Sequence, residues 1–130
     1  MNYKLHYLAS PYSHQEAEKR LERFNLVGEA VVRFLHLGVY VFSPIAYNAP
    51  MEKHNLPTDW NFWQNYDKAF IERCDSVIVF AIEGHEKSVG VAAEIEFAKS
   101  LNLPIFYVTL DDVEDAESFA TWCKESGFTF

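Results

Sequence analysis

Residues 75–82 read DSVIVFAI, a nearly continuous apolar run that is rich in β-branched side chains. Such a run is typical of a β-strand that is covered on both faces, as strands of parallel sheets are. Shorter runs predict further strands at residues 3–9, 39–42 and 104–109. Helical periodicity lies between them, and strands that alternate with helices at this spacing favour right-handed βαβ units. The predicted fold is α/β, a three-layer flavodoxin- or Rossmann-like sandwich with a parallel sheet of four or five strands.

The first helix is expected at residues 14–37, followed by Gly38 where a helix C-cap glycine belongs. Apolar side chains recur there at steps of four and three, which predicts one buried stripe. The charged residues of this segment, including Arg20 and Arg23, are expected on the other face. The predicted buried stripe consists of Ala17, Leu21, Phe24, Gly28, Val31 and Leu35.

Three later helices are expected at residues 60–74, 88–102 and 115–126. Asp59 is a good N-cap for the first of them. The segment 43–59 contains three prolines and shows no periodicity. A structureless segment of that length is uncommon in a compact domain and is usually a lid, a binding loop or disordered. We therefore treat it as a candidate lid.

Composition and charge narrow the class of protein. With 130 residues, 49% of them apolar, the chain suits one domain over residues 1–130. It has no apolar run long enough to span a membrane and no signal-peptide pattern at its start. Cys74 and Cys123 form no metal or CxxC pattern, which favours reduced thiols and a cytoplasmic location. The net charge of −8 disfavours binding to long nucleic acids. The five histidines show no metal-ligand spacing, so neither a metal nor a cofactor is expected.

The start of the helix after the 75–82 strand is a candidate anion site. In open parallel sheets, ligands bind beyond the carboxyl ends of the strands. The sequence there, GHEKSVGVAAE at residues 84–94, places Ser88 and Gly90 in the first helical turn. Free backbone N–H groups at such a position favour a phosphate or a carboxylate. The complete ATP or NAD loop patterns are missing, and a serine there is also an ordinary N-cap.

Two carboxylates stand out by their helical positions. Asp67 falls in the middle of an apolar stripe, about 40° from Trp63, and burying a carboxylate is costly unless it is partnered or used. Glu94 falls about 60° from the buried line of its own helix. Paired carboxylates perform glycosidic bond cleavage. A structurally bonded Asp67 and a solvated Glu94 are the alternatives. The buried line beside Glu94 is expected to consist of Val91, Ile95, Ala98 and Asn102.

Several of these residues form an ordered set of motifs. The set comprises YLASPY at residues 7–12, SPI at 43–45, Asp67 eight positions before Asp75, and SVGVAAE at 88–94. It resembles the nucleoside 2-deoxyribosyltransferase-like superfamily over residues 3 to about 108. The closest likeness is to a branch that is often encoded by phages.

The resemblance implies roles for individual residues. Glu94 matches the family's nucleophile, Asp67 its aspartate near the base, and Tyr7 the tyrosine that orients the nucleophile. Ser88 matches the serine that contacts phosphate in deoxynucleoside 5′-monophosphate N-glycosidases, where the transferases have an aspartate that binds the 5′-hydroxyl. The glycosidases' arginine-bearing loop is replaced here by Ser-Pro-Tyr-Ser at residues 10–13.

The expected function is therefore cleavage of the N-glycosidic bond of a (deoxy)nucleoside 5′-monophosphate, which releases a free base and (deoxy)ribose 5-phosphate. The alternatives are base exchange by a nucleoside 2-deoxyribosyltransferase and nucleotide sensing without catalysis. The resemblance further implies a homodimer or a larger homo-oligomer. Trp60 is a further candidate to stack on the base. The expected substrate-binding residues are Ser10, Pro11, Tyr12, Ser43, Tyr47, Trp63, Ser88 and Gly90.

Overall fold

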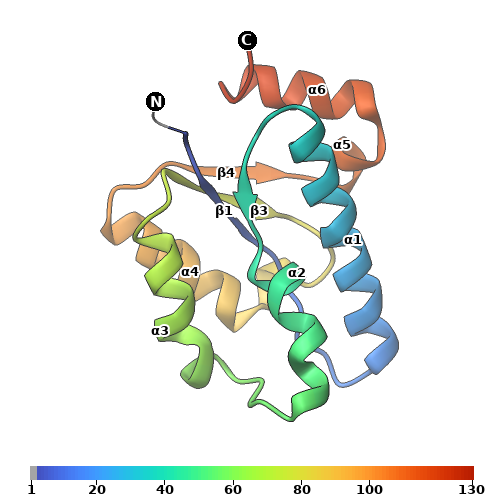
Figure 1. Cartoon of the computed structure of the whole chain (residues 1–130), viewed down its shortest axis with the longest axis vertical. Helices are drawn as coiled ribbons and strands as arrows, with labels where there is room; N and C mark the ends of the chain where they lie inside the picture. Colours follow the sequence, from blue (N-terminus) through green and yellow to red (C-terminus); the bar gives the residue numbers. More distant parts are fainter. Residues whose placement is uncertain (1–2) are drawn as a thin grey trace.

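The computed structural model describes residues 3–130 and has the predicted α/β architecture, with a four-stranded, all-parallel sheet in the order β2-β1-β3-β4 (Figure 1). β1 and β3 occupy the middle of the sheet and are buried at every position, and for β3 the apolar run at residues 75–82 predicts this burial. The register pairs His6 of β1 with Val41 on one side and with Ser76 on the other. The strands are β1 (His6–Ala9), β2 (Val41–Phe42), β3 (Ser76–Phe80) and β4 (Ile105–Val108).

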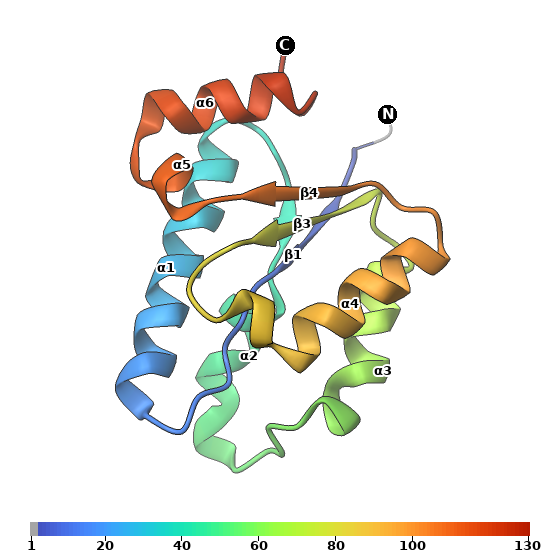
Figure 2. The same ribbon diagram turned by 180° about the vertical axis from the view of Figure 1, so that it is seen from behind.

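Helices cover both faces of the sheet, so the three-layer prediction is confirmed (Figure 2). α1 (Ala17–His36), α5 (Leu110–Glu114) and α6 (Ala116–Glu125) pack on one face, and α3 (Trp60–Ile71) and α4 (Val89–Ser100) pack on the other. Side chains alternate between the faces along each strand. In β1, Leu8 therefore joins the core under α1, whereas Tyr7 joins the core under α3 and α4.

The predicted buried face of α1 is wrong by about one residue. Its buried side chains are Val27, Ala30 and Phe34, whereas Leu21 and Leu35 are 59% and 53% exposed. The pattern of apolar residues alone indicates the wrong face of α1, because two arginines occupy the first two turns of the face that is buried. The helix also begins at Ala17 rather than at residue 14, because Glu16 is extended.

The candidate lid is more ordered than its sequence predicts. It contains α2 (Pro44–Asn48) and the 3₁₀ helix η1 (Ala49–His54). The Ser43 hydroxyl caps α2 by accepting from the Ala46 amide at 3.0 Å. These helices, like α5, are too short to show a helical period, so the prediction of an aperiodic 43–59 loop is wrong for its first twelve residues.

Several helix ends also differ from their predictions. α3 begins after Asp59 as expected, although the Asp59 side chain makes no capping hydrogen bond. α4 ends at Ser100, and Asn102 is exposed in the left-handed region with a φ of 59°. Asn102 is therefore not part of the buried line beside Glu94. Gly38 follows α1 with a φ of +73°, as a residue beyond a helix C-cap often does.

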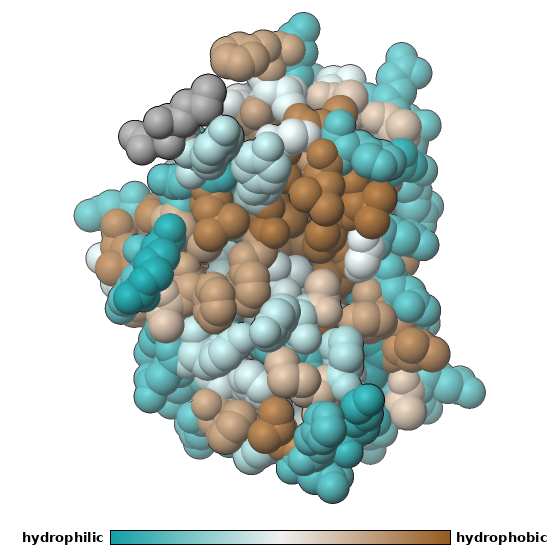
Figure 3. Space-filling view, in the orientation of Figure 1, coloured by the Kyte–Doolittle hydropathy of each residue, from teal (hydrophilic) through white to brown (hydrophobic). Residues whose placement is uncertain are grey.

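The β2 edge of the sheet faces outward between α1 and α3. In Figure 3, apolar side chains gather over β2 and the neighbouring part of α1. The segment 37–51, which includes β2 and α2, contains no charged residue. Within residues 3–130, no helix is both long and apolar enough to cross a membrane.

Alanine substitutions at Phe34 and Leu35 distinguish the buried face of α1 in the structure from the buried face predicted by the sequence. Phe34 is fully buried and packs edge-on against Phe119 at a centroid distance of 4.8 Å. Phe34→Ala should therefore lower the free energy of unfolding by about 3–5 kcal/mol. Leu35→Ala, one position along the same helix, should change it by less than about 1 kcal/mol because Leu35 is already half exposed. Urea denaturation measures both values, and equal losses would contradict the observed face.

Candidate active site

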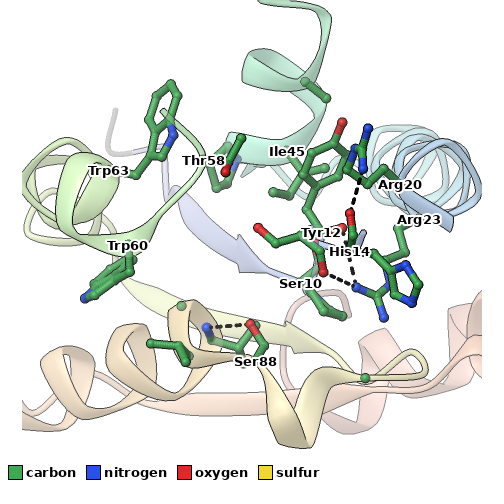
Figure 4. A pocket seen from close by; sticks show the side chains of 18 of the residues that line it. Ser10, Tyr12, His14, Arg20, Arg23, Ile45, Thr58, Trp60, Trp63 and Ser88 are labelled. Carbon is green, nitrogen blue, oxygen red and sulfur yellow. Dashed lines mark hydrogen bonds between the residues drawn. The ribbon is translucent and has the colours of Figure 1, made fainter. Parts of the chain in front are cut away.

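A large cavity opens at the carboxyl ends of β1 and β3, where the fold class predicts a ligand site (Figure 4). Its volume is about 1470 Å³. The loops after β1 and β3 form part of its wall, together with the first turns of α1, α3 and α4. The α2–η1 segment, which forms most of the candidate lid at residues 43–59, lines another side of the cavity.

Tyr7, Asp67 and Glu94 meet beneath this cavity. β1 directs the fully buried Tyr7 side chain toward α4, and its hydroxyl donates a hydrogen bond to Glu94 Oε2. Glu94 is only 4% exposed and Asp67 on α3 only 8% exposed, yet both line the cavity. The solvated alternative for Glu94 is therefore wrong, and the inward position predicted for Asp67 is confirmed.

The environment of the two carboxyl groups favours their neutral forms. Burial raises the pKa of Asp67 to about 6. Burial, followed by the charge of Asp67, raises the pKa of Glu94 well above its usual range, although the Tyr7 hydrogen bond opposes this shift. Two such close carboxyls titrate as a pair, so one proton is retained between them near neutral pH. Burial and the carboxylates also raise the pKa of Tyr7, which keeps its hydroxyl protonated as a donor.

Two buried oxygens at the cavity have no hydrogen-bond partner within the described residues, Asp67 Oδ1 and Ser10 Oγ. Buried polar atoms are nearly always hydrogen-bonded, and exceptions call for an explanation. Both atoms belong to residues that line the cavity beside Glu94. The floor of the cavity therefore holds hydrogen-bonding capacity that the described chain does not use.

The start of α4 forms another part of the cavity wall. Ser88 caps the helix as expected, since its hydroxyl accepts from the Val91 amide at 3.2 Å. The positive end of the α4 dipole consequently points toward the cavity. Gly90 lies beneath Trp60, because a Cβ atom added to Gly90 would be 3.7 Å from Trp60 Cε3. Trp60 thus covers the first turn of α4 at the cavity edge.

Hydrogen bonds and an ion pair hold the other parts of the cavity wall together. The Tyr12 hydroxyl donates to Glu52 Oε2 at 2.9 Å, and Arg20 Nε lies 2.7 Å from Glu52 Oε1. Burial, then the hydrogen bond and charge of Glu52, raise the pKa of Tyr12 to about 12. Trp63 Nε1 donates to the Pro57 carbonyl at 2.7 Å. The contacts of Glu52 fix η1 to the loop after β1. The Trp63 hydrogen bond fixes that side chain to the last part of the 43–59 segment.

The cavity includes two arginines that sequence reasoning placed on the outside of α1. Arg20 and Arg23 line it, as does His14 from the loop before α1 (Figure 4). The signal was present in the sequence, since residues 20, 23, 27, 30 and 34 form one series of three- and four-residue steps. Arginines interrupted the apolar count, although their long side chains can line a partly buried face.

The structure brings most of the expected substrate-binding residues together, but it leaves two outside. Ser43 is buried as the cap of α2, and Tyr47 is 62% exposed and packs beside Phe42. Neither lines the cavity. The expected residues that do line it are Ser10, Pro11, Tyr12, Trp63, Ser88 and Gly90. Across residues 3–130, no three His, Cys, Asp or Glu side chains form a group that could hold a metal ion.

Together, the fold and this cavity define a Rossmann-like α/β domain with a buried carboxyl pair at the carboxyl edge of its sheet. The chain belongs to the family described as Domain of unknown function (DUF1937), which matches residues 4–110. That match includes all four strands and every residue that lines the cavity. A comparison with curated proteins finds no match.

The raised pKa of Asp67 predicts a stability that depends on pH. An acid with a higher pKa in the folded state stabilises the fold at low pH and loses this contribution as pH rises through the folded pKa. At pH 8, Asp67→Asn should therefore raise the free energy of unfolding by up to roughly 3 kcal/mol, the equivalent of a shift from 3.8 to about 6. At pH 4 the gain should vanish.

Urea denaturation at both pH values measures this effect. The exposed Asp111→Asn is the control, and it should show no such difference between pH 4 and pH 8. An Asp67→Asn variant that is equally affected at both pH values would contradict the raised pKa.

Proposed function

We propose that the chain cleaves the N-glycosidic bond of a (deoxy)nucleoside 5′-monophosphate and releases a free base and (deoxy)ribose 5-phosphate. The observation that carries the proposal is the Tyr7–Glu94–Asp67 group beneath an open cavity. Enzymes that cleave glycosidic bonds usually use two carboxyl groups, one as the acid and the other as the nucleophile or base. The motif resemblance to nucleoside 2-deoxyribosyltransferases supports the same chemistry.

Glu94 is the nucleophile in this scheme. Its carboxylate attacks the anomeric carbon as the bond from that carbon to the base nitrogen breaks, and a glycosyl ester forms on Glu94. The Tyr7 hydrogen bond occupies Oε2, restrains the side chain and stabilises its ionised form. The other oxygen remains for the attack.

Asp67 is the general acid and then the general base in this scheme. In the singly protonated pair, the form with the proton on Asp67 can donate it to the departing base. The Asp67 carboxylate then takes a proton from a water molecule, whose oxygen attacks the anomeric carbon as the bond from that carbon to the Glu94 oxygen breaks. The original protonation of the pair is restored, and one water molecule is consumed for each base released.

The proposed phosphate position is the start of α4. The helix dipole and first-turn amides favour an anion there, and Ser88 adds a hydroxyl instead of a repelling carboxylate. Trp60 lies beside this turn and Trp63 further along the same wall, so both offer ring faces to the rest of the ligand. The substrate would thus span from the α4 terminus across Glu94.

Base exchange is the second candidate, and the cavity volume favours it. At about 1470 Å³, the cavity exceeds the range of roughly 300–1,000 Å³ that is usual for small-molecule sites. The extra space is available to a second base. In that case a free base, instead of water, would attack the ester on Glu94.

Substitution of Glu94 tests the proposed nucleophile. The wild-type chain should release base from at least one of a panel of 5′-monophosphates, as followed by chromatography, and Glu94→Gln should lower kcat by at least about 10³-fold because no nucleophile remains. Glu96→Gln, on the exposed side of the same helix, should retain wild-type activity.

The same panel, run with nucleosides and with an added free base, separates the candidates. Release that requires the second base would indicate a transferase. Tight nucleotide binding without any release would indicate a sensor and overturn both enzymatic candidates.

Substitution of Ser88 tests whether the substrate is a nucleotide or a nucleoside. Ser88→Asp should retain the fold, because aspartate caps helices as well as serine does. Its carboxylate should repel a phosphate, so kcat/KM for the monophosphate should fall at least about 100-fold while the value for the matching nucleoside is maintained or rises. An equal fall for both substrates would place the phosphate elsewhere.

A further inference from the structure

The Arg23 side chain joins the two loops that form the cavity mouth. Its Nη1 donates to the carbonyls of Ser13 at 2.9 Å and Tyr12 at 3.4 Å, in the loop after β1. Its Nη2 donates to the Glu83 carbonyl at 3.3 Å, in the loop after β3. One guanidinium group on α1 therefore contacts backbone carbonyls in the loops that follow both central strands of the sheet.

Gly84 makes this arrangement possible. A Cβ atom added to Gly84 would lie only 2.4 Å from Arg23 Nη2, and the residue has a φ of +95°. Any other residue would meet both a steric conflict with the guanidinium and a strained backbone. The sequence around this contact is thus constrained from both sides, by an arginine on α1 and by a glycine in the loop.

The bonded loops carry the groups that face the cavity. The loop after β1 begins with Ser10, whose buried hydroxyl has no partner within the described chain. The loop after β3 leads through η2 (His85–Lys87) to Ser88 and the start of α4. The sheet pairing of β1 with β3 ends at Ala9 and Val79, so strand hydrogen bonds do not hold these loops together.

We propose that Arg23 is a positioning residue that fixes the spacing between the two loops and thereby the binding geometry for the phosphate end of the substrate. The second half of this inference rests on the proposed function. Arginine suits the role because its planar group presents several donors in fixed directions, whereas a lysine ammonium concentrates its donors at one point. The nearby pair of Lys19 and Glu83, 3.9 Å apart with Glu83 mostly exposed, is a weak substitute.

Arg33 provides a matched control on the same helix. Its Nε donates to the Val113 carbonyl at 2.8 Å and its Nη2 to the Glu114 carbonyl at 3.1 Å. It therefore also joins α1 to backbone carbonyls, but it does not line the cavity. Arg33→Ala and Arg23→Ala remove comparable bonds, and only the latter touches the cavity mouth.

Hydrogen–deuterium exchange of the ligand-free chain tests the positioning role directly. Arg23→Ala should increase the exchange rate of amides in residues 12–16 and 82–88 at least about tenfold, and Gly84→Ala should do the same because it displaces the guanidinium. Arg33→Ala should leave both loops at the wild-type rate. Unchanged loop exchange in Arg23→Ala would overturn the proposal, whatever the activity of the protein.

Steady-state kinetics test the link to substrate. Arg23→Ala should raise KM for the 5′-monophosphate about tenfold, with kcat and the KM for the nucleoside within about threefold of wild type. Added guanidinium ion should restore part of the lost affinity, as a merely structural lesion would not allow. Equal changes in Arg33→Ala, or altered loop exchange with an unchanged KM, would overturn the role in binding. Absence of base release in the wild type would overturn the proposed function and leave the exchange result to decide the loop spacing.

Discussion

The hydrogen bond from Tyr7 to Glu94 links the middle of the sheet to the helix that covers it, and the rest of the site is arranged around it. A carboxyl group at the bottom of a cavity needs a partner that remains a donor over a wide pH range. The buried tyrosine meets this need because its own pKa is raised. Tyr7 can face α4 only because β1 lies between two other strands and alternates its side chains between two covered faces. The architecture of the sheet thus decides the chemistry beneath the cavity.

Positive groups line the same cavity as this carboxyl pair without neutralising it. Arg20 is paired with Glu52, and Arg23 is hydrogen-bonded to backbone carbonyls, so both cations hold the cavity walls. Neither appears among the causes that shift the pKa of Asp67 or Glu94, and those causes raise both values on balance. An ion pair would lower the carboxyl pKa values and remove the proton that the pair retains near neutral pH. The separation of cations from carboxyls therefore preserves a proton donor within the cavity.

Periodicity alone predicted those parts of the molecule in which apolar residues mark buried faces. The central strands and the inward position of Asp67 followed from such patterns, whereas the capping role of Ser88 followed from its residue type at a helix start. The face of α1 did not, because arginines line its first turns. The helices α2 and α5 were missed because five residues do not complete a recognisable period. The contact between Tyr7 and Glu94 joins positions 87 residues apart, and only the resemblance to a family suggested it. Long-range contacts of single side chains leave no periodic trace in a sequence.

The central position of β1 has a consequence for the order in which the chain is assembled. His6 pairs with Ser76, which follows it by 70 positions, so β1 has to wait for β3 during synthesis. At about 5–20 residues per second, translation from Ala9 to Phe80 takes roughly 4–14 s. During that interval the apolar segment at residues 5–9 has only β2 as a strand partner, and that partner offers two residues. The nascent chain therefore cannot form this pairing until β3 has been made, and binding by chaperones would be most useful before β3 emerges.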